Sequence, residues 1–169
     1  GDYTTAEILC SYFMILFTQW RCSMTLEGTI KSLGIAVSKL NPMDQVDKIE
    51  LITGQGIIGD RHLRTDGTRS KRQILLMDIE TLIEFGLSER DIKENITVQG
   101  IDFSLIRSGN IAKIGKDVIL EISGDCEPCS RMDELRPGLK NAIDGRRGML
   151  AYVKSGGEIS SGDTIIIED

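Results

Sequence analysis

The sequence predicts a mainly β protein: a compact, partly closed β-barrel with a few short helices. Short apolar stretches recur along the chain and are separated by Gly, Asn and Asp residues, as in short strands joined by tight turns. The chain has 18 glycines against three prolines, and only 5% of its residues are aromatic, which favours many turns. Its 169 residues, 40% of them hydrophobic, are enough for one domain with a buried core.

The expected strands are short and lie between turn signals. The Asn41-Pro42 pair marks a turn between the first two strands. Residues 156–167 are expected to form a hairpin that finishes in an apolar strand. The strands are expected at residues 29–37, 48–53, 73–77, 95–98, 111–114, 118–122, 149–153 and 164–167.

Two short helical segments are expected between these strands. Asp78 is a good N-cap for a helix that runs to Phe85, and Gly86 is placed to end it. Ser88 is expected to cap a second helical turn that ends at Ile92.

Residues 1–24 stand apart from this pattern. Residues 8–17 form an apolar run that is too short to span a bilayer. No basic region precedes the run and no small-residue cleavage site follows it, so a signal peptide is not expected. We expect residues 1–24 to be a leader or appendage, either non-native or an extra helix, and residues 25–169 to form the barrel domain.

Charge and cysteine content narrow the function classes. The formal net charge of −6 argues against a general binder of nucleic acids or membrane surfaces. Cys10, Cys22, Cys126 and Cys129 lack the spacing of a disulfide framework. Their thiols are therefore expected to be reduced, and the protein to be cytoplasmic.

Cys129 is the main candidate for chemistry. It follows the expected strand at 118–122 and a turn-rich segment, and Pro128 fixes the backbone just before it. Because Asp125 and Glu127 are close in sequence and raise the pKa of a thiol, a reactive thiolate needs cations from elsewhere in the fold. The candidate cations are Arg61, His62, Arg69, Lys71, Arg72, Arg146 and Arg147.

The Cys126–Cys129 spacing leaves three other interpretations open. It is the spacing of two of the four ligands in many zinc sites, but the only other candidate ligands are His62, Cys10 and Cys22. It is also the spacing of a redox dithiol, although here a proline precedes the second cysteine and the surroundings are β-rich. The third interpretation is two small apolar side chains that fill a turn.

The basic segment that begins at Gly59-Asp60-Arg61-His62 offers many hydrogen-bond donors for an anion. Arginine suits bidentate contacts with phosphates and oxoanions; the alternative is a solvated loop. His62 is the only histidine and is a candidate for proton transfer or anion binding. Asn95, at the start of a strand, either orients a ligand or satisfies a turn.

An ordered set of short motifs resembles the MOSC domain family, the modules found at the carboxyl end of molybdenum-cofactor sulfurases and as small stand-alone bacterial proteins. The resemblance covers residues 28–169, and one departure is Asn110, where an aspartate is more usual. The motifs are Gly59-Asp60-Arg61-His62, Arg72-Gln73, Glu94-Asn95-Ile96, Gly100-Ile101-Asp102, Gly109-Asn110, Pro128-Cys129, Arg147-Gly148 and Gly162-Asp163.

The resemblance implies a barrel of the pyruvate-kinase type and a role with molybdenum and sulfur. It implies that Cys129 carries sulfur as a persulfide or serves as a ligand of molybdenum in a pterin cofactor. The matching pocket positions are Arg61, His62, Arg72 and Asn95, and further candidates for cofactor binding are Arg69, Lys71 and Arg147.

The same resemblance leaves two alternative functions open. Several larger relatives reduce N-hydroxylated compounds at a molybdenum centre, and a non-enzymatic module that binds an oxoanion or pterin is the other alternative. The implied partners are a cysteine desulfurase or molybdenum-cofactor enzymes. Pyridoxal phosphate is expected only on the partner enzyme. Assembly of this chain into a homo-oligomer is compatible with the resemblance. No nucleic acid or membrane partner is expected.

Overall fold

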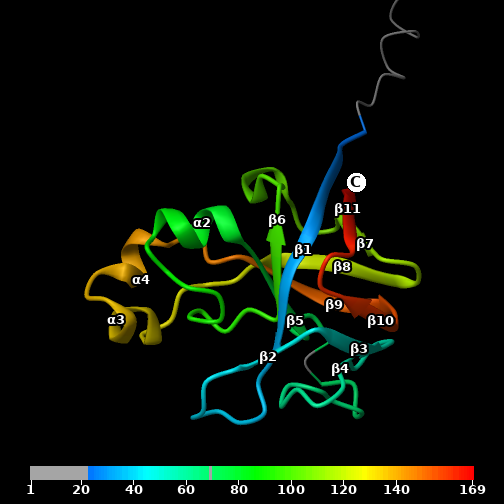
Figure 1. Cartoon of the computed structure of the whole chain (residues 1–169), viewed down its shortest axis with the longest axis horizontal. Coiled ribbons are helices and arrows are strands. Elements are labelled where there is room, and N and C mark those ends of the chain that lie inside the picture. Colours follow the sequence, from blue (N-terminus) through cyan, green and yellow to red (C-terminus); the bar gives the residue numbers. More distant parts are fainter. Residues whose placement is uncertain (1–22, 69) are drawn as a thin grey trace, which may run out of the picture.

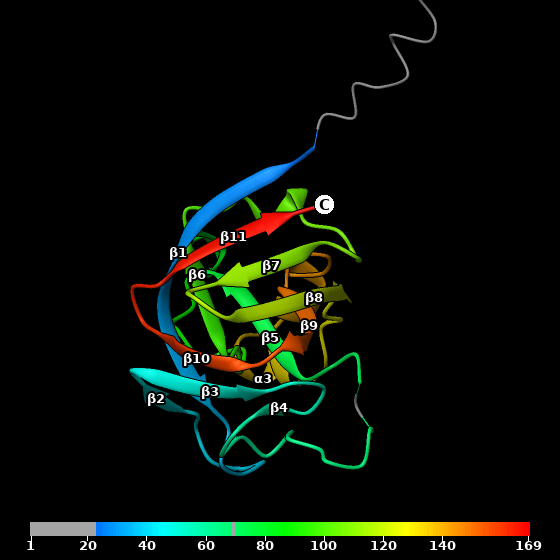
Figure 2. The same ribbon diagram turned by 90° about the vertical axis from the view of Figure 1, so that its right-hand side faces the viewer.

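Seven strands form a closed barrel in the computed structural model, which describes residues 23–68 and 70–169 (Figures 1 and 2). Around the barrel the order is β11-β7-β8-β9-β5-β6-β1, and β1 pairs back with β11. Every neighbouring pair is antiparallel except β5 and β6, which are parallel. The strands are β1 Thr25–Ile35, β5 Ile74–Asp78, β6 Ile96–Gln99, β7 Ile111–Ile114, β8 Val118–Asp125, β9 Met149–Ser155 and β11 Thr164–Glu168.

The mainly β fold predicted from the sequence is confirmed, and the barrel is fully closed rather than partly closed. A smaller sheet of order β10-β3-β4 packs at one end of the barrel, and β2 pairs with the end of β1 (Figure 2). These strands are β2 Asp44–Val46, β3 Lys48–Ile52, β4 Gly56–Ile57 and β10 Gly157–Ser160.

Three short α-helices gather on one side of the barrel (Figure 1). They are α2 Ile79–Glu84, α3 Arg131–Leu135 and α4 Leu139–Ala142, and a 3₁₀ turn, η1, covers Phe103–Leu105. The predicted cap of α2 is confirmed, because the Asp78 carboxylate accepts a hydrogen bond from the Thr81 N–H at 3.0 Å. Gly86 ends this helix with φ +66°.

The second predicted helical turn does not form. Ser88 does not act as a side-chain cap; its N–H instead donates to the Asp91 carboxylate at 2.8 Å. Arg90 and Lys93 take φ values of +73° and +67°, which a right-handed helix does not allow. The chain therefore passes through irregular turns before it enters β6.

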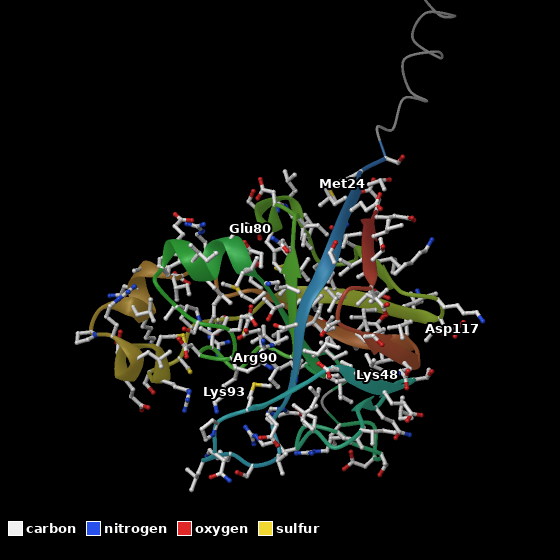
Figure 3. The ribbon with its side chains drawn as sticks, viewed as in Figure 1. Met24, Lys48, Glu80, Arg90, Lys93 and Asp117 are labelled. Atoms are coloured by element: carbon white, nitrogen blue, oxygen red, sulfur yellow. The ribbon has the colours of Figure 1, made fainter. Side chains whose placement is uncertain are left out.

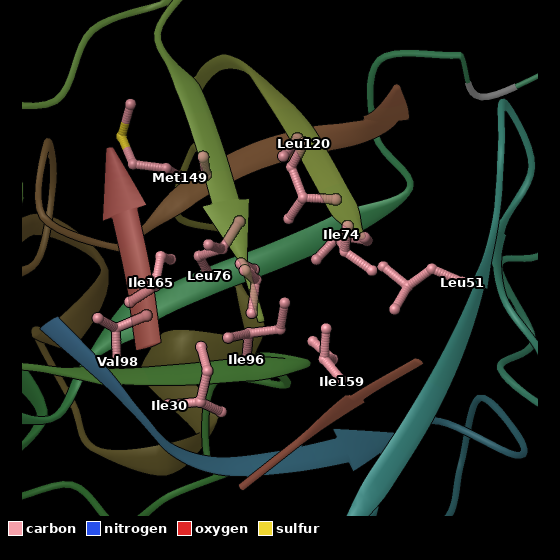
Figure 4. Close-up of a cluster of buried hydrophobic side chains, with 14 of the residues drawn as sticks. Ile30, Leu51, Ile74, Leu76, Ile96, Val98, Leu120, Met149, Ile159 and Ile165 are labelled. Atoms are coloured by element: carbon pink, nitrogen blue, oxygen red, sulfur yellow. The ribbon is translucent and has the colours of Figure 1, made fainter. Parts of the chain in front are cut away.

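Strand β5 separates two apolar cores, and all five of its residues are buried. Because side chains alternate across a strand, Leu76 points into the barrel while Met77 packs against the helices. Figure 4 shows the barrel core, with Ile30, Leu76 and Ile165 among its members. The helix-side core consists of Met77, Leu82, Ile92, Met132, Leu139 and Ile143. It fixes the chain that follows β8 against the barrel.

The described start and the end of the chain lie together. β1 pairs with β11 from Thr25↔Glu168 onward, and the Met24 N–H donates to the Asp169 carboxylate at 2.9 Å. Of the predicted leader at residues 1–24, residues 1–22 lie outside the described residues, as does Arg69. In the described part of the chain, no helix is long and apolar enough to cross a membrane.

Candidate functional site

A cavity of about 440 Å³ opens at one end of the barrel. This volume lies within the rough 300–1,000 Å³ range of small-molecule sites. We call it the basic pocket. Its lining residues are Ala36, Ser38, Lys39, Leu40, Arg61, His62, Arg72, Gln73, Ile74, Leu75, Lys93, Asn95, Cys126, Cys129, Arg131, Glu134, Arg147 and Leu150.

Strand direction explains why segments far apart in the sequence meet at this pocket. β1 and β8 end there, while β5, β6 and β9 begin there. The connections at these strand ends carry the lining side chains. Binding residues in barrels commonly sit on such loops, held by a rigid sheet.

The pocket is strongly cationic in a chain whose formal net charge is −6. Among residues 23–68 and 70–169, Glu134 is the only acidic residue that lines the pocket. Burial lowers the pKa of Lys93, and the charges of Arg131 and Arg61 lower it further, so these cations repel one another. An anion in the pocket would relieve that repulsion. The lining cations are Lys39, Arg61, Arg72, Lys93, Arg131 and Arg147.

Asp60 is the buried residue that holds one wall of the pocket. Its Oδ2 accepts hydrogen bonds from the Ala36 N–H at 2.8 Å and from Asn95 Nδ2 at 3.1 Å. Its Oδ1 accepts from the N–H and from the ring Nδ1 of His62, both at 2.8 Å. Burial by itself raises the pKa of Asp60, but the hydrogen bonds from His62 and Ala36 outweigh it and hold the pKa below its usual range. The ionised carboxylate therefore fixes the Arg61–His62 segment and the His62 tautomer.

Asn95 lines the pocket, but its side-chain amide makes its hydrogen bonds with other parts of the protein. Its Oδ1 accepts from the Leu75 N–H at 3.1 Å, and its Nδ2 donates to the Gly34 carbonyl at 3.2 Å as well as to Asp60. Of the two interpretations left open by the sequence, the geometry favours the structural one. Asn95 ties β1 and β5 to the turn that carries Asp60.

The two cysteines of the Cys126–Cys129 pair are free thiols in different environments. Cys129 is exposed, whereas Cys126 is 4% exposed. Nη1 of Arg147 donates to the Cys126 sulfur in a short contact, and its Nη2 donates to the Ile92 carbonyl at 3.1 Å. Burial raises the pKa of the Cys126 thiol, while the charges of Arg147 and Arg72 oppose the rise.

Two guanidinium groups of the pocket retain unused donors. The Nε atoms of Arg131 and Arg147 are buried and have no hydrogen-bond partner among the described residues. A buried donor without a partner is costly, at about 1–3 kcal/mol. Both groups line the pocket, so an anionic ligand is the natural acceptor.

A buried polar network supports the segment that carries Lys93 and Asn95. Arg90 Nη2 donates to the Glu89 carboxylate at 2.8 Å and contacts the Ser32 hydroxyl, while its N–H donates to Glu94 at 2.6 Å. Both Arg90 and Lys93 are in the left-handed region of backbone space, and Figure 3 shows Arg90 beside β1, where it contacts Ser32. The network fixes this unusual path, which the sequence alone did not reveal.

The structure brings most of the predicted site residues together. Lys71 is exposed and is not part of the lining. Arg146 turns away to α2, where its Nη1 donates to Glu84 at 2.9 Å. The predicted residues that line the pocket are Arg61, His62, Arg72, Asn95, Cys129 and Arg147. Sequence reasoning missed Lys39, Lys93 and Arg131, which lie outside the motifs that suggested the site.

The zinc interpretation depends on further ligands near the two cysteines. Within residues 23–68 and 70–169, no group of three or more His, Cys, Asp or Glu side chains is arranged to hold a metal ion. His62 is instead engaged with Asp60.

The chain belongs to the MOSC domain family, whose sequence profile matches residues 76–166. The matched region runs from β5 to β11 and includes Cys126, Cys129 and Arg147. The resemblance drawn from the ordered motifs is thereby confirmed. No curated protein sequence matches the chain.

Solved structures of small bacterial proteins share the fold. The YuaD protein from Bacillus subtilis superposes with a TM-score of 0.73 at 22% identity, over 87% of this chain and 98% of that chain. YiiM from Geobacillus stearothermophilus gives a TM-score of 0.66 at 18% identity, over 83% of this chain and 74% of that chain. YiiM from Escherichia coli gives 0.63 at 16% identity, over 82% and 69%.

Proposed function

We propose that this protein handles the molybdenum cofactor or its sulfur, with Cys129 as the working thiol. The thiol would carry sulfur as a persulfide or bind molybdenum of a pterin cofactor. The observation that carries the proposal is an exposed thiol in the wall of a cationic pocket. In the part of the chain that the structure describes, six Lys and Arg residues and one acidic residue line this pocket.

The pocket residues suit such a cofactor in three respects. The lining cations match the phosphate of a pterin cofactor, and arginine binds phosphate through two donors at once. The buried Nε atoms of Arg131 and Arg147 lack an acceptor that an anionic ligand can provide. A cysteine thiolate is a soft ligand, as molybdenum–sulfur units require.

The chain's own part is positioning and electrostatics. The bound cofactor would supply the metal-centred redox and oxo-transfer chemistry. Asp60 holds the Arg61–His62 segment at the pocket edge, and the exposed Cys129 remains open to a sulfur donor and an acceptor. A cysteine desulfurase is the partner class that we propose as the donor.

Protein purified from a host that makes the cofactor tests the proposal. We expect bound molybdenum or pterin, or the mass of one added sulfur atom on Cys129 after incubation with a cysteine desulfurase and cysteine. Cys129→Ser is expected to lose the adduct. Absence of metal and pterin from the wild-type protein, together with absence of the sulfur adduct from both the wild-type protein and Cys126→Ser, would contradict the proposal.

A matched pair of variants tests the role of the cations. Arg131→Ala removes a lining guanidinium and is expected to weaken binding of the pterin phosphate about tenfold, from the roughly 1.5 kcal/mol of one charged hydrogen bond. Lys116→Ala removes an exposed cation on the β7–β8 turn and is expected to leave the affinity unchanged. Equal losses in the two variants would mean that overall charge, not the pocket, sets the affinity.

A second candidate function is oxoanion binding without thiol chemistry, and the repulsion of Lys93 by Arg131 and Arg61 favours it. This candidate predicts that Cys129→Ala still binds the ligand while Arg72→Ala does not. The reverse pattern favours the thiol-centred function.

A further inference from the structure

Cys126 has no part in the function proposed above, yet it lines the same pocket as Cys129. Only Glu127 and Pro128 separate the two thiols in sequence. One is buried and the other is exposed, and both are free. Paired thiols of unequal access are typical of proteins in which the exposed sulfur reacts first and the buried one second.

The surroundings of Cys126 go beyond those of a cysteine that only fills space. Arg147 is 8% exposed, and its Nη1 contacts the Cys126 sulfur. No carboxylate among the described residues forms an ion pair with this guanidinium. A buried guanidinium without a carboxylate is costly, and here the nearest group that can become an anion is the Cys126 thiol.

The backbone holds this pair of groups in place. The Cys126 N–H donates to the Gly148 carbonyl at 3.0 Å. Gly148 has φ +87°, and a Cβ there would lie 2.2 Å from the Leu76 carbonyl oxygen. The segment after Arg147 is therefore pressed against β5, so the guanidinium cannot move away from the sulfur through its backbone.

We propose that Cys126 is the resolving thiol of Cys129. This inference rests on the persulfide form of the proposed function. The Cys126 sulfur attacks the inner sulfur of a Cys129 persulfide, the Cys126–Cys129 disulfide forms, and the outer sulfur leaves with the bonding electron pair as hydrosulfide. The Cys126 proton goes to the leaving hydrosulfide or to solvent. The sulfane sulfur is reduced to sulfide, the two cysteine sulfurs are oxidised to the disulfide, and a dithiol reductant of the thioredoxin class restores both thiols.

The difference in burial separates the two steps. Cys129 meets the donor because it is exposed, and Cys126 is shielded from it. Burial also keeps Cys126 as a thiol at neutral pH, since its pKa is raised, while Arg147 and Arg72 stabilise the thiolate as it forms. The chain can thus release its sulfur as sulfide instead of passing it on intact.

A two-step thiol titration tests the resolving role without any sulfur donor. Full-length protein with Cys10→Ser and Cys22→Ser, so that only two thiols respond, is treated with one equivalent of 2,2′-dithiodipyridine. Cys129 should release one equivalent of pyridinethione, and attack by Cys126 should release a second. Cys126→Ser and Cys126→Ala should stop after the first, and Arg147→Lys should slow only the second release, about tenfold.

Loading the same proteins with polysulfide tests the persulfide form. The parent should release hydrosulfide and show the Cys126–Cys129 disulfide by non-reducing peptide mapping, while the Cys126 variants should keep the added sulfur on Cys129 at least tenfold longer. Release of a second pyridinethione without any sulfur uptake would support Cys126 as the resolving thiol but would contradict the carrier function of Cys129. Sulfur uptake with a single pyridinethione, or equal hydrosulfide release with and without Cys126, would overturn the resolving role.

Discussion

Replacing Asp60 with Asn removes the charge that organises the pocket wall while leaving the side-chain volume nearly unchanged. Each carboxylate oxygen accepts two hydrogen bonds, one pair from Ala36 and Asn95 and the other from His62. The amide of Asn has one oxygen and one NH₂ group. In either orientation, its NH₂ faces two donors and cannot accept from them.

The expected cost follows from those two lost bonds. A hydrogen bond to a charged group contributes about 1.5–3 kcal/mol. His62 is only half-buried, so water can partly replace its bonds, and we take the lower figure for each. The free energy of unfolding should fall by about 3 kcal/mol, which corresponds to a decrease of roughly 6–12 °C in Tm for a domain of this size.

Urea unfolding of both proteins as a function of pH measures this cost and its origin. The pKa of Asp60 is lowered in the folded state, so its stabilisation is present above the unfolded value of 3.8 and is lost as the pH falls through the folded pKa. The stability gap between wild type and Asp60→Asn should therefore be full at pH 7 and narrow below about pH 4. The variant should also bind an anionic ligand less tightly, since Arg61 and His62 lose their anchor.

Asp117→Asn is the matched control. Asp117 is exposed on the β7–β8 turn, well away from Lys93 in Figure 3, and should change the stability by less than about 0.5 kcal/mol. A loss below 1 kcal/mol in Asp60→Asn, or a gap that stays constant down to acid pH, would refute the reasoning about the buried carboxylate.

Two further predictions concern the packing that places the cysteine segment. Gly148→Ala should destabilise the protein by about 3 kcal/mol or more in thermal unfolding, because the new Cβ clashes with the Leu76 carbonyl oxygen and alanine disfavours the positive φ. Gly145→Ala is the control, since Gly145 has φ +76° but open space around it. In the same assay it should cost only the conformational part, roughly 1–2 kcal/mol. Met132→Ala leaves a cavity at a fully buried position of α3 and should lower the free energy of unfolding in urea by about 2–5 kcal/mol. Leu135 is exposed on the same helix, and Leu135→Ala should lower it by less than about 1 kcal/mol. Similar losses of stability in the two variants would contradict the assigned core.

Local signals made much of the fold predictable. Asp78 followed by an apolar helix face and Gly86 marks α2 from both ends, and the cap bond to Thr81 forms as expected. Closure of the barrel depends instead on β1 pairing with β11, residues that lie at opposite ends of the described chain. Alternating side chains show that a strand has two faces but do not name its partner.

Site residues that belong to sequence motifs were predictable. Residues that reach the pocket only because of the path of the backbone were not. Arg146 and Arg147 are neighbours in sequence, yet one binds Glu84 and the other contacts Cys126. Lys93 reaches the pocket because of the positive φ values around it, and Arg131 reaches it because α3 packs on the helix-side core. Neither cause leaves a pattern in the sequence.

The reactivity of Cys129 toward charged thiol reagents tests the central claim most directly. In full-length protein with Cys10, Cys22 and Cys126 replaced by Ser, an anionic aromatic disulfide should react faster than a neutral one after correction for their intrinsic rates. The excess should shrink with added salt and in Arg131→Ala, since screening and loss of a cation both weaken the pocket's field. An equal corrected rate for the two reagents, unchanged by salt, would contradict an exposed thiol set in a cationic pocket.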